Sequence, residues 1–587
     1  MTEKTENPKD VRTFDHERIE VLYRKSTPIS DPECRYPGLK PGSTVLPKGS
    51  VHREGALPLS CDIIFERDVA VPMRDGTIIY IDIFRPAGSD KVPAVIGWSP
   101  YGKKGGLQSL DMMPGRLGIP VSVLSDLQAW EGPDPAYWCD HGYAIVNPDA
   151  RGAFMSEGDI HFWGSQEAED GHDLIEWLAV REWSNGKVGL TGNSWLAILQ
   201  WFIAASQPPH LAAIAPWEGL SDLYRHDIAR GGIPNTVFNN RIITHLFGNN
   251  RTEDIPAMLT KYPLMNAYWE EKAAKLEKIE VPAYVVASFT NPLHAYGTFE
   301  GFLGISSQEK WLRVHNTMEW VDYYDPIQIE DLRRFFDRYL KDMDNGWEKT
   351  PKVRLSVLDP GGIDEVGRVE NGFPPAQSQY EKLFLDASAG ALTMNPVAQE
   401  SKVQYRADDG KGQATFTIRF EEESEFIGYL KLRLWVEADG ADDMDLFVLV
   451  QKLNKEGDPF TSAVVPLPEH VMKVPIGLLV YPGPNGRLRV SHRQLDEERS
   501  TPSRPYQTHK AEELLSPGQI VPVEIPIYPI GMRWHGGEQL RVIVAGYDLK
   551  GPLFPGTPLA PTRNKGKHII HTGGTYDSHL LVPMIRR

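Results

Sequence analysis

Short hydrophobic runs alternate with helical patterns through the first part of the chain. Segments such as 92–98 (VPAVIGW) and 187–191 (KVGLT) are bounded by turn residues, as buried parallel strands are. Between such runs, the segment 167–180 (EAEDGHDLIEWLAV) has helical spacing and acids in its first turn. Because strands that alternate with helices form a parallel sheet covered on both faces, this pattern predicts an α/β fold. The other expected strands of the sheet are 144–146, 211–215, 283–287 and 311–314.

Changes in this pattern divide the chain into predicted domains. Residues 1–58 are polar and rich in proline, which predicts an extended N-terminal arm. Residues 222–279 lose the strand pattern and are mostly helical, which predicts a cap inserted over the sheet edge. From residue 351 to 587, short alternating segments separated by turns predict an all-β sandwich or jelly roll. The α/β domain then comprises residues 59–221 and 280–350.

Composition restricts the partners that we expect. The chain has 587 residues and a net charge of -17 without a basic stripe, which argues against nucleic acid. No apolar run is long enough to span a membrane, and the N-terminus lacks the hydrophobic core of a secretory signal. Cys34, Cys61 and Cys139 are odd in number and far apart, so we expect free thiols in a reducing compartment, the cytoplasm. We expect no metal and no cofactor; a homo-oligomer is compatible with the sequence.

The most specific local signal is Gly192-Asn193-Ser194-Trp195. A strand stops, glycine permits a tight turn, and a serine stands where a helix begins, which is the context of a nucleophile elbow. In such a turn the Ser194 hydroxyl is exposed, and the N–H of Trp195 can bind a developing oxyanion. The residue two places after the serine is Leu196, where a glycine is usual. A serine that only caps a helix would give a similar local pattern.

A nucleophilic serine needs a base, and in this type of fold the acid and then the histidine follow the serine along the chain. His315 follows the last expected parallel strand and is the predicted base. Tyr101 follows the strand at 92–98, at the edge where oxyanion loops lie, and its hydroxyl could donate to the oxyanion. Each residue taken alone also has a structural interpretation, a histidine after a strand and an aromatic packed in a turn.

These residues lie in motifs that resemble the cocaine esterase-like hydrolases, related to X-Pro dipeptidyl-peptidases and α-amino acid ester hydrolases. The resemblance covers roughly residues 60–587 and implies an α/β-hydrolase domain, a helical cap and a C-terminal jelly roll. It implies serine hydrolysis of esters or amides through an acyl-enzyme. The family's nucleophile falls on Ser194, its base on His315, and its oxyanion donors on Tyr101 and the Trp195 N–H. The motifs are SPYGKKG (99–105), NPDARGAFMSEGDI (147–160), WSNGKVGLTGNSWLAILQW (183–201), AAIAPWEGLSDLYR (212–225) and LRVHNTMEW (312–320).

The sequence departs from that family at the acid. The loop where the family places an aspartate reads SFTNPLH, and Asn291 occupies the acid position. An amide can orient a histidine but cannot stabilise its imidazolium by charge. Asn291 could work on an activated acyl donor, or the site could be weakened. His294, in the same loop, could approach the site, but we interpret it as a loop residue bonded to backbone. A carboxylate after His315 could also serve as the acid; the candidates are Glu319, Asp322 and Asp325.

The expected function is therefore hydrolysis of carboxylic ester or amide bonds of a small, largely apolar substrate. Aromatic side chains near the strand ends, together with the cap, predict an apolar pocket. An acyltransferase using the same acyl-enzyme and a catalytically weakened binding protein are the alternatives. The aromatic residues expected to line the pocket are Trp130, Trp138, Trp217 and Phe289.

Overall fold

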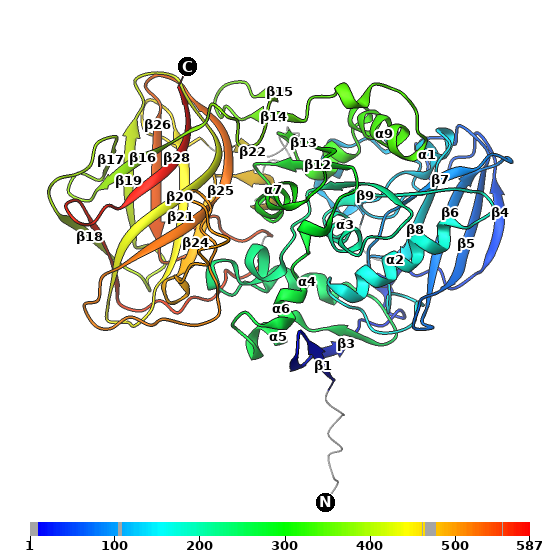
Figure 1. Ribbon diagram of the computed structural model, residues 1–587, viewed down its shortest axis with the longest axis horizontal. Coiled ribbons are helices and arrows are strands. Elements are labelled where there is room, and N and C mark those ends of the chain that lie inside the picture. The colour runs from blue at the N-terminus through cyan, green and yellow to red at the C-terminus, as the bar shows by residue number, and fades with distance from the viewer. Residues whose placement is uncertain (1–9, 104–108, 461, 464–476, 555, 587) are drawn as a thin grey trace, which may run out of the picture.

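The computed structural model describes residues 10–103, 109–460, 462–463, 477–554 and 556–586. The predicted arm therefore lies outside the described residues over positions 1–9. Two 11-stranded sheets form two lobes, one coloured blue to green and the other yellow to red in Figure 1. An α/β domain followed by an all-β domain confirms the predicted fold class.

The first sheet has the strand order β15-β14-β13-β12-β10-β9-β7-β8-β6-β5-β4. Its central strands, from β8 to β14, run parallel, so their carboxyl ends meet at one edge, where ligand sites of such sheets lie. The strands are β4 (Gly42–Leu46), β5 (Ile63–Pro72), β6 (Ile78–Pro86), β7 (Val92–Ile96), β8 (Ala144–Asp149), β9 (Ser184–Asn193), β10 (Leu211–Trp217), β12 (Ala283–Ser288), β13 (Lys310–His315), β14 (Val353–Val357) and β15 (Glu365–Glu370).

Helices pack against this sheet through apolar faces. Helix α3 (Trp195–Ala205) is apolar almost all round and packs on β9, β10 and α2 (Ser165–Ala179), so it is buried. The longer α9 (Pro326–Leu340) packs on β9 and β10. The remaining helical elements of this domain are η2 (Leu110–Met112), η3 (Pro114–Gly118), η4 (Val121–Val123), α1 (Pro135–Asp140), α7 (Ala295–Gly304), α8 (Glu319–Tyr323) and η8 (Trp347–Lys349).

The region of the expected cap, 222–279, lies low in the centre of Figure 1 and is mostly helical. One strand in it, β11 (Arg251–Glu253), pairs with β3 (Tyr23–Lys25) of the arm, and β4 of the arm joins the main sheet. The arm therefore ties the cap to the sheet domain. The other elements are η5 (Tyr224–Ile228), η6 (Arg230–Gly232), α4 (Val237–Thr244), α5 (Ile255–Lys261), α6 (Ala267–Glu271) and η7 (Leu276–Lys278) in the cap, and β1 (Val11–Phe14), β2 (Glu17–Glu20) and η1 (Pro32–Cys34) in the arm.

The second sheet begins at β16, so β14 and β15, which follow the expected boundary at residue 351, belong to the first sheet. Its order is β18-β27-β20-β25-β24-β21-β26-β19-β17-β16-β28, with β28 pairing with β20 as well. The strands and short helices are β16 (Gln379–Asp386), β17 (Ala391–Thr393), β18 (Ser401–Arg406), β19 (Gln413–Arg419), β20 (Ser424–Asp439), β21 (Asp445–Leu453), β22 (Ser462–Ala463), η9 (Gly477–Leu479), β23 (Val480–Tyr481), β24 (Asn485–Arg489), η10 (Val490–His492), β25 (Val521–Trp534), β26 (Gln539–Ala545), β27 (Lys567–Thr572) and β28 (His579–Arg586).

The two lobes meet where β25 packs against α7 and β14 (Figure 1). The Tyr528 hydroxyl donates to the carbonyl of Pro292 at 3.3 Å, and Phe289 packs against Gly531. Both contacts hold the loop that follows β12.

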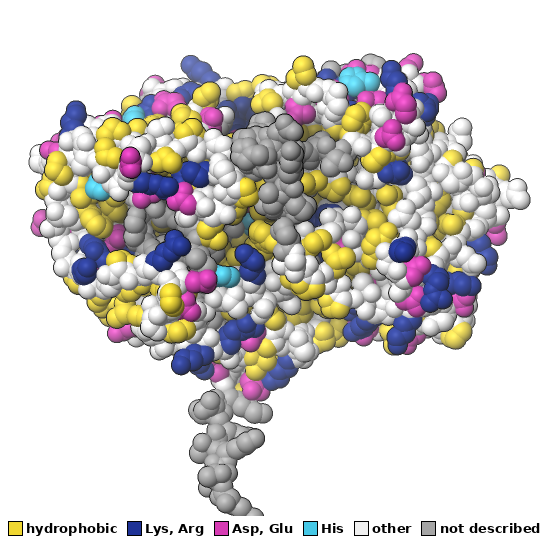
Figure 2. Space-filling model, turned by 180° about the vertical axis from the view of Figure 1, so that it is seen from behind, with side chains coloured by type: hydrophobic (Ala, Val, Ile, Leu, Met, Phe, Trp, Pro, Cys, Tyr) yellow, Lys and Arg dark blue, Asp and Glu magenta, His cyan; other side chains and the backbone are white. Residues whose placement is uncertain are grey.

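On the face seen in Figure 2, acidic and basic side chains are interspersed. In the described part of the chain, we find no helix with the length and apolarity that crossing a membrane requires.

Candidate functional site

Ser194 stands in a strained turn between β9 and α3. Its backbone has φ 53° and ψ -120°, a region that non-glycine residues rarely adopt. The preceding Gly192 has φ +138°, and a Cβ there would meet the Glu131 carbonyl oxygen at 3.0 Å. The Ser194 N–H donates to the carbonyl of Glu218 at 3.2 Å. The elbow predicted from the sequence is therefore present in the backbone geometry.

Leu196 is accommodated where a glycine is usual because its neighbours are glycines. A Cβ added at Gly97 would lie 3.2 Å from the Leu196 side chain, one at Gly132 3.7 Å, and one at Gly192 2.5 Å. These glycines leave room for the Leu196 side chain. Leucine at this position is therefore compatible with the tight turn.

A pocket of about 700 Å³ opens beside Ser194. Tyr101, Glu131, His294 and Glu319 share its lining with Ser194, whereas His315 is not among the described lining residues. The rest of the lining is largely apolar. It comes from the cap, the chain before α1, the loop after β12, α8 and the C-terminal domain: Met112, Met113, Trp130, Phe238, Arg241, Ile242, His245, Leu293, Trp320, Leu478 and Phe554.

Tyr101 and Trp195 both lie beside Ser194. The Tyr101 side chain is hydrogen-bonded to Ser194, and burial raises the pKa of its hydroxyl well above the usual value, so the phenol keeps its proton. Trp195 is the first residue of α3, and N–H groups in the first turn of a helix have no intrahelical partner. The Tyr101 side chain is therefore at the serine, and the Trp195 N–H belongs to the helix start that directly follows it.

His294 lies in the loop after β12 and is buried beside Ser194 in two neighbouring pockets. Its Nε2 lies 4.0 Å from a carboxylate oxygen of Glu319, and its buried Nδ1 has no hydrogen-bond partner among the described residues. Burial lowers the pKa of His294 to about 4, although the charge of Glu218 opposes this. The imidazole is therefore neutral at neutral pH and can accept a proton.

Asn291 connects two buried carboxylates. Its amide nitrogen donates to Glu218 and, at 3.1 Å, to Glu319, while its oxygen accepts from the N–H groups of Leu293 and His294 at 2.9 and 3.0 Å. The amide oxygen is thus used by the loop backbone rather than by His315. Burial, with the charges of Glu218 and Glu131, raises the pKa of Glu319 well above its usual range.

His315, at the end of β13, has a different environment from the one expected. Its Nε2 contacts the carboxylate of Glu218, and its Nδ1 accepts from the Thr317 N–H at 3.3 Å. Burial lowers the pKa of His315, but the charges of Asp322 and Glu218 outweigh that effect, and the pKa is raised. Both ring nitrogens therefore face groups other than the serine, Nε2 the carboxylate of Glu218 and Nδ1 the N–H of Thr317.

Sequence reasoning missed Glu218 and Glu131. Glu218 follows β10 with a left-handed backbone, φ 57°, and is fully buried. Glu131 has φ 63° and lines the pocket; one carboxylate oxygen accepts from the Trp320 indole at 2.8 Å and the other is unpartnered among the described residues. Burial raises the pKa of Glu131 to about 8. Glu218 directly follows Trp217 at the end of β10, and Glu131 follows Trp130 in the loop before α1; neither position gave a sequence signal of its own.

The other expected residues have structural contacts. Asp322 forms a buried ion pair with Arg313, and Asp325 caps the N-terminus of α9. Of the four predicted pocket aromatics, only Trp130 lines the Ser194 pocket. Trp138 packs on Tyr137, Tyr143 and Phe336, Trp217 on Tyr284 and Tyr323, and Phe289 on Phe299, Phe373 and Gly531.

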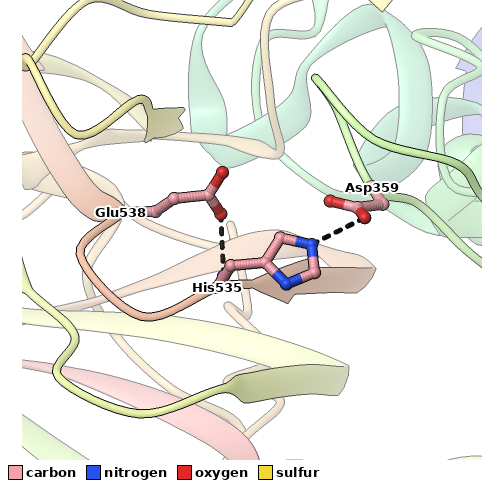
Figure 3. A group of neighbouring side chains, drawn as sticks. All are labelled: Asp359, His535 and Glu538. Carbon is pink, nitrogen blue, oxygen red and sulfur yellow. Dashed lines mark hydrogen bonds and ion pairs between the residues drawn. The ribbon is translucent and has the colours of Figure 1, made fainter.

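One group of side chains has metal-ligand spacing, Asp359, His535 and Glu538 (Figure 3). The ammonium of the buried Lys452 already contacts both carboxylates, at 2.7 Å from Asp359 and 2.9 Å from Glu538. His535 Nε2 lies 2.8 Å from the other oxygen of Asp359. A lysine cation thus occupies the place a metal would need, so the group is arranged as an ion-pair cluster.

Comparison with known proteins is consistent with this architecture. Residues 75–256 match the X-Pro dipeptidyl-peptidase (S15 family) model, and residues 345–581 match the model of the X-Pro dipeptidyl-peptidase C-terminal non-catalytic domain. Cocaine esterase of Rhodococcus sp. (strain MB1 Bresler) is 34% identical over 56% of this chain and 63% of that enzyme. That alignment therefore spans a little under two thirds of cocaine esterase.

Solved structures extend the similarity to almost the whole chain. A CocE/NonD family hydrolase from Staphylococcus aureus has a TM-score of 0.84 and 36% identity, covering 93% of this chain and 97% of that one. An α-amino acid ester hydrolase has a TM-score of 0.66 at 17% identity, covering 89% and 97%, which supports the fold alone.

Proposed function

Because the chain belongs to the CocE/NonD family of serine hydrolases, which cleave ester or amide bonds, we propose that it forms an acyl-enzyme on Ser194 with His294 as general base. One observation carries the proposal: Ser194, Tyr101, His294 and Glu319 line one pocket, and His315 faces Glu218 instead.

The proposed chemistry uses groups that the pocket brings together. The Ser194 hydroxyl attacks the substrate carbonyl while its proton passes to His294. Tyr101 and the Trp195 N–H donate to the oxyanion that develops. His294 then gives the proton to the departing alkoxide or amine, and a water activated by His294 releases the acid from Ser194.

In this proposal the histidine and the acid have exchanged loops. The order assumed from sequence places the acid after β12 and the histidine after β13; here His294 follows β12 and Glu319 follows β13. The contact between His294 Nε2 and Glu319 supports this assignment. Asn291 acts as a positioning residue, because it binds the backbone of His294 and the carboxylate of Glu319 together. Glu319, 4.0 Å from the ring, would stabilise the imidazolium in its ionised form.

The lining supports a small, largely apolar substrate. Trp130 and Trp320 pack on each other at one side of the pocket, and Ile242, Phe238 and Leu293 lie around it.

A cytoplasmic location stays part of the proposal. The three cysteines are unpaired, and burial raises the pKa of each thiol, which keeps them in the less reactive protonated form.

The test uses the full chain with p-nitrophenyl esters and a fluorophosphonate probe. We expect the probe to label Ser194, and Ser194→Ala to lose labelling and at least about 10³-fold of the hydrolysis rate. Ser388→Ala, an exposed serine in the C-terminal domain, is the matched control and should keep both. Equal ester hydrolysis by Ser194→Ala and the unmodified protein would refute the proposed nucleophile.

A further inference from the structure

A second pocket, of about 740 Å³, adjoins the Ser194 pocket where the cap meets the C-terminal domain. Four side chains, Phe238, Arg241, Leu293 and Phe554, line both pockets. Phe238 and Arg241 come from α4, Leu293 from the loop after β12, and Phe554 from the segment after β26. A molecule bound at Ser194 therefore has this second pocket as its neighbour.

Basic side chains outnumber acidic ones in the described lining of this pocket, which contains Arg230, Arg241, Arg487 and Lys550 against Asp227 and Asp548. Both acids already have partners. Asp548 pairs with Arg487 at 3.2 Å, and Asp227 accepts from the Asn239 amide at 2.6 Å. The charge of Asp548 also acts on Arg230 and Lys550, so the two acids offset the four basic side chains only in part.

Arg230 is the most informative of these cations. It is only 6% exposed, and its guanidinium donates to the Asn485 side-chain oxygen at 2.8 Å and the Asn485 carbonyl at 2.5 Å, both neutral acceptors. Its other contact is stacking on the Tyr528 ring, at 4.0 Å. Burial lowers the pKa of Arg230 to about 10. A buried charge is normally paired with an opposite charge. Arg230 has no carboxylate at ion-pair distance among the described residues, so an anion bound in the pocket could pair with it.

Further polar groups in the same lining form no ion pair among the described residues. Burial lowers the pKa of Lys550 to about 7, although the charge of Asp548 opposes this. Among the described residues, no carboxylate lies within ion-pair distance of the Lys550 ammonium or of the Arg241 guanidinium, which instead stacks on Phe554 at 4.9 Å. His226, 8% exposed, has a buried Nδ1 with no hydrogen-bond partner in the part of the chain that the structure describes. Guanidinium, ammonium and imidazole groups together are the donors that recognise a carboxylate or phosphate.

We propose that this pocket binds an anionic group, such as a carboxylate, carried by the ester or amide that is cleaved at Ser194. The proposal rests on the proposed function and narrows its substrate class to molecules with an apolar reacting part and a distal anion. The shared lining supports an anion on the substrate rather than a separate ion, because the two pockets are in contact through four side chains.

The experiment compares charged and neutral esters on the full chain. Mono-p-nitrophenyl esters of dicarboxylic acids of increasing length are each paired with the p-nitrophenyl ester of the monocarboxylic acid of the same length. A second arm pairs acetate esters of hydroxy acids with acetates of simple alcohols, which distinguishes an anion on the acyl part from one on the alcohol part. We expect one arm to show a preference in kcat/KM of about 10-fold or more for the anionic ester at an optimal length.

Variants then assign the preference to the pocket. Lys550→Gln and Arg230→Gln should each lower the charged-to-neutral ratio towards one, whereas Lys411→Gln, an exposed lysine on the C-terminal domain, should keep it. Ser194-dependent cleavage of neutral esters without a charge preference in either arm would overturn this inference and leave the proposed function intact. Inorganic phosphate that accelerates neutral esters, with no preference in either arm, would identify a separate anion and overturn it equally. Failure to cleave any ester through Ser194 would instead refute the proposed function.

Discussion

Burial determines the protonation of the side chains around Ser194. His294 is deprotonated more easily than a free imidazole, and Glu319 and Glu131 hold their protons more tightly than free carboxyls. In the proposed site a neutral base is therefore available over a wide pH range. His315 is affected in the opposite sense, because the adjacent carboxylates of Glu218 and Asp322 raise its pKa.

The pH dependence of hydrolysis follows from the proposed base. A base acts when it is unprotonated, so activity is present above its pKa and is lost as the pH falls through that value. Because the pKa of His294 is lowered to about 4, we expect the acid limb of kcat/KM near pH 4 rather than near the usual value of about 6.5. The measurement is a profile of kcat/KM with a neutral ester from acid to neutral pH. A single limb between about pH 6 and 7 would point to a different base.

Replacing Asn291 by aspartate tests whether the site is weakened by the lack of a carboxylate at this position. In the structure the amide donates to Glu218 and Glu319, so Asn291→Asp removes both bonds and adds a third carboxylate. We expect a loss of stability of at least about 1.5–3 kcal/mol, the range for hydrogen bonds to charged groups, and lower activity. Thermal unfolding and ester hydrolysis check this, with Asn185→Asp, whose amide donates to the Leu340 carbonyl, as control. Higher activity in Asn291→Asp would show instead that an acid belongs there.

At the scale of elements, the site depends on four strand ends and the start of one helix. β9 and α3 position Ser194, β7 is followed by Tyr101, and the loops after β12 and β13 carry His294 and Glu319. The start of α3 packs closely on the chain after β10, where a Cβ at Gly219 would lie 2.7 Å from the backbone of Ala197 and Ile198. The elbow is therefore fixed by its neighbours as well as by its own turn.

Gly219→Ala should disturb the start of α3. Backbone atoms cannot yield as a flexible side chain can, so we expect destabilisation of about 1–3 kcal/mol and a lower rate of Ser194 labelling. The control is Gly42→Ala in β4, where an added Cβ meets nothing within 4 Å. Equal unfolding temperatures for Gly219→Ala and Gly42→Ala would contradict the close packing described.

Features with local signals could be predicted from the sequence, and features set by tertiary contacts could not. Strand and helix order and the elbow at Ser194 follow from periodicity and turn residues, and the fold class was confirmed. Glu218 could be recognised only in the structure, because its contacts with His315 and Asn291 depend on how the neighbouring strand ends lie. His294 has a sequence feature that agrees with its proposed role: it is a histidine in a loop that lacks an acid, while the next loop carries Glu319. The usual order of acid and histidine favours His315 as the base instead, and that assignment stays a prediction.

At the scale of the whole molecule, the C-terminal domain supports the loop that carries His294. Tyr528 and Gly531 of β25 contact Pro292 and Phe289, on either side of Asn291. The same domain supplies Leu478 and Phe554 to the Ser194 pocket, and Arg487 and Lys550 to the second pocket. Both the geometry of the proposed base and the shape of the substrate site thus depend on how the two lobes pack.

Gly531→Ala tests this dependence between the lobes. A Cβ at this position would lie 2.2 Å from the Phe289 ring, so Phe289 and its loop must shift. We expect kcat to fall by about 10-fold or more, because small displacements of a catalytic group are costly. Steady-state kinetics, with circular dichroism to verify folding, provide the measurement, and Gly42→Ala again serves as control. Unchanged kcat in Gly531→Ala would show that the lobe contact does not position the loop.

The proposed assignment of the base to His294 rather than to His315 is tested most directly by the rate of fluorophosphonate labelling of Ser194 in His294→Gln and His315→Gln. The labelling rate reports activation of the serine without a choice of substrate, and thermal unfolding of both variants verifies that they are folded. We expect His294→Gln to label at least about 10³-fold more slowly than the unmodified protein, and His315→Gln to remain within about 10-fold despite a lower unfolding temperature. Fast labelling of folded His294→Gln together with loss of labelling in folded His315→Gln would contradict the proposed base.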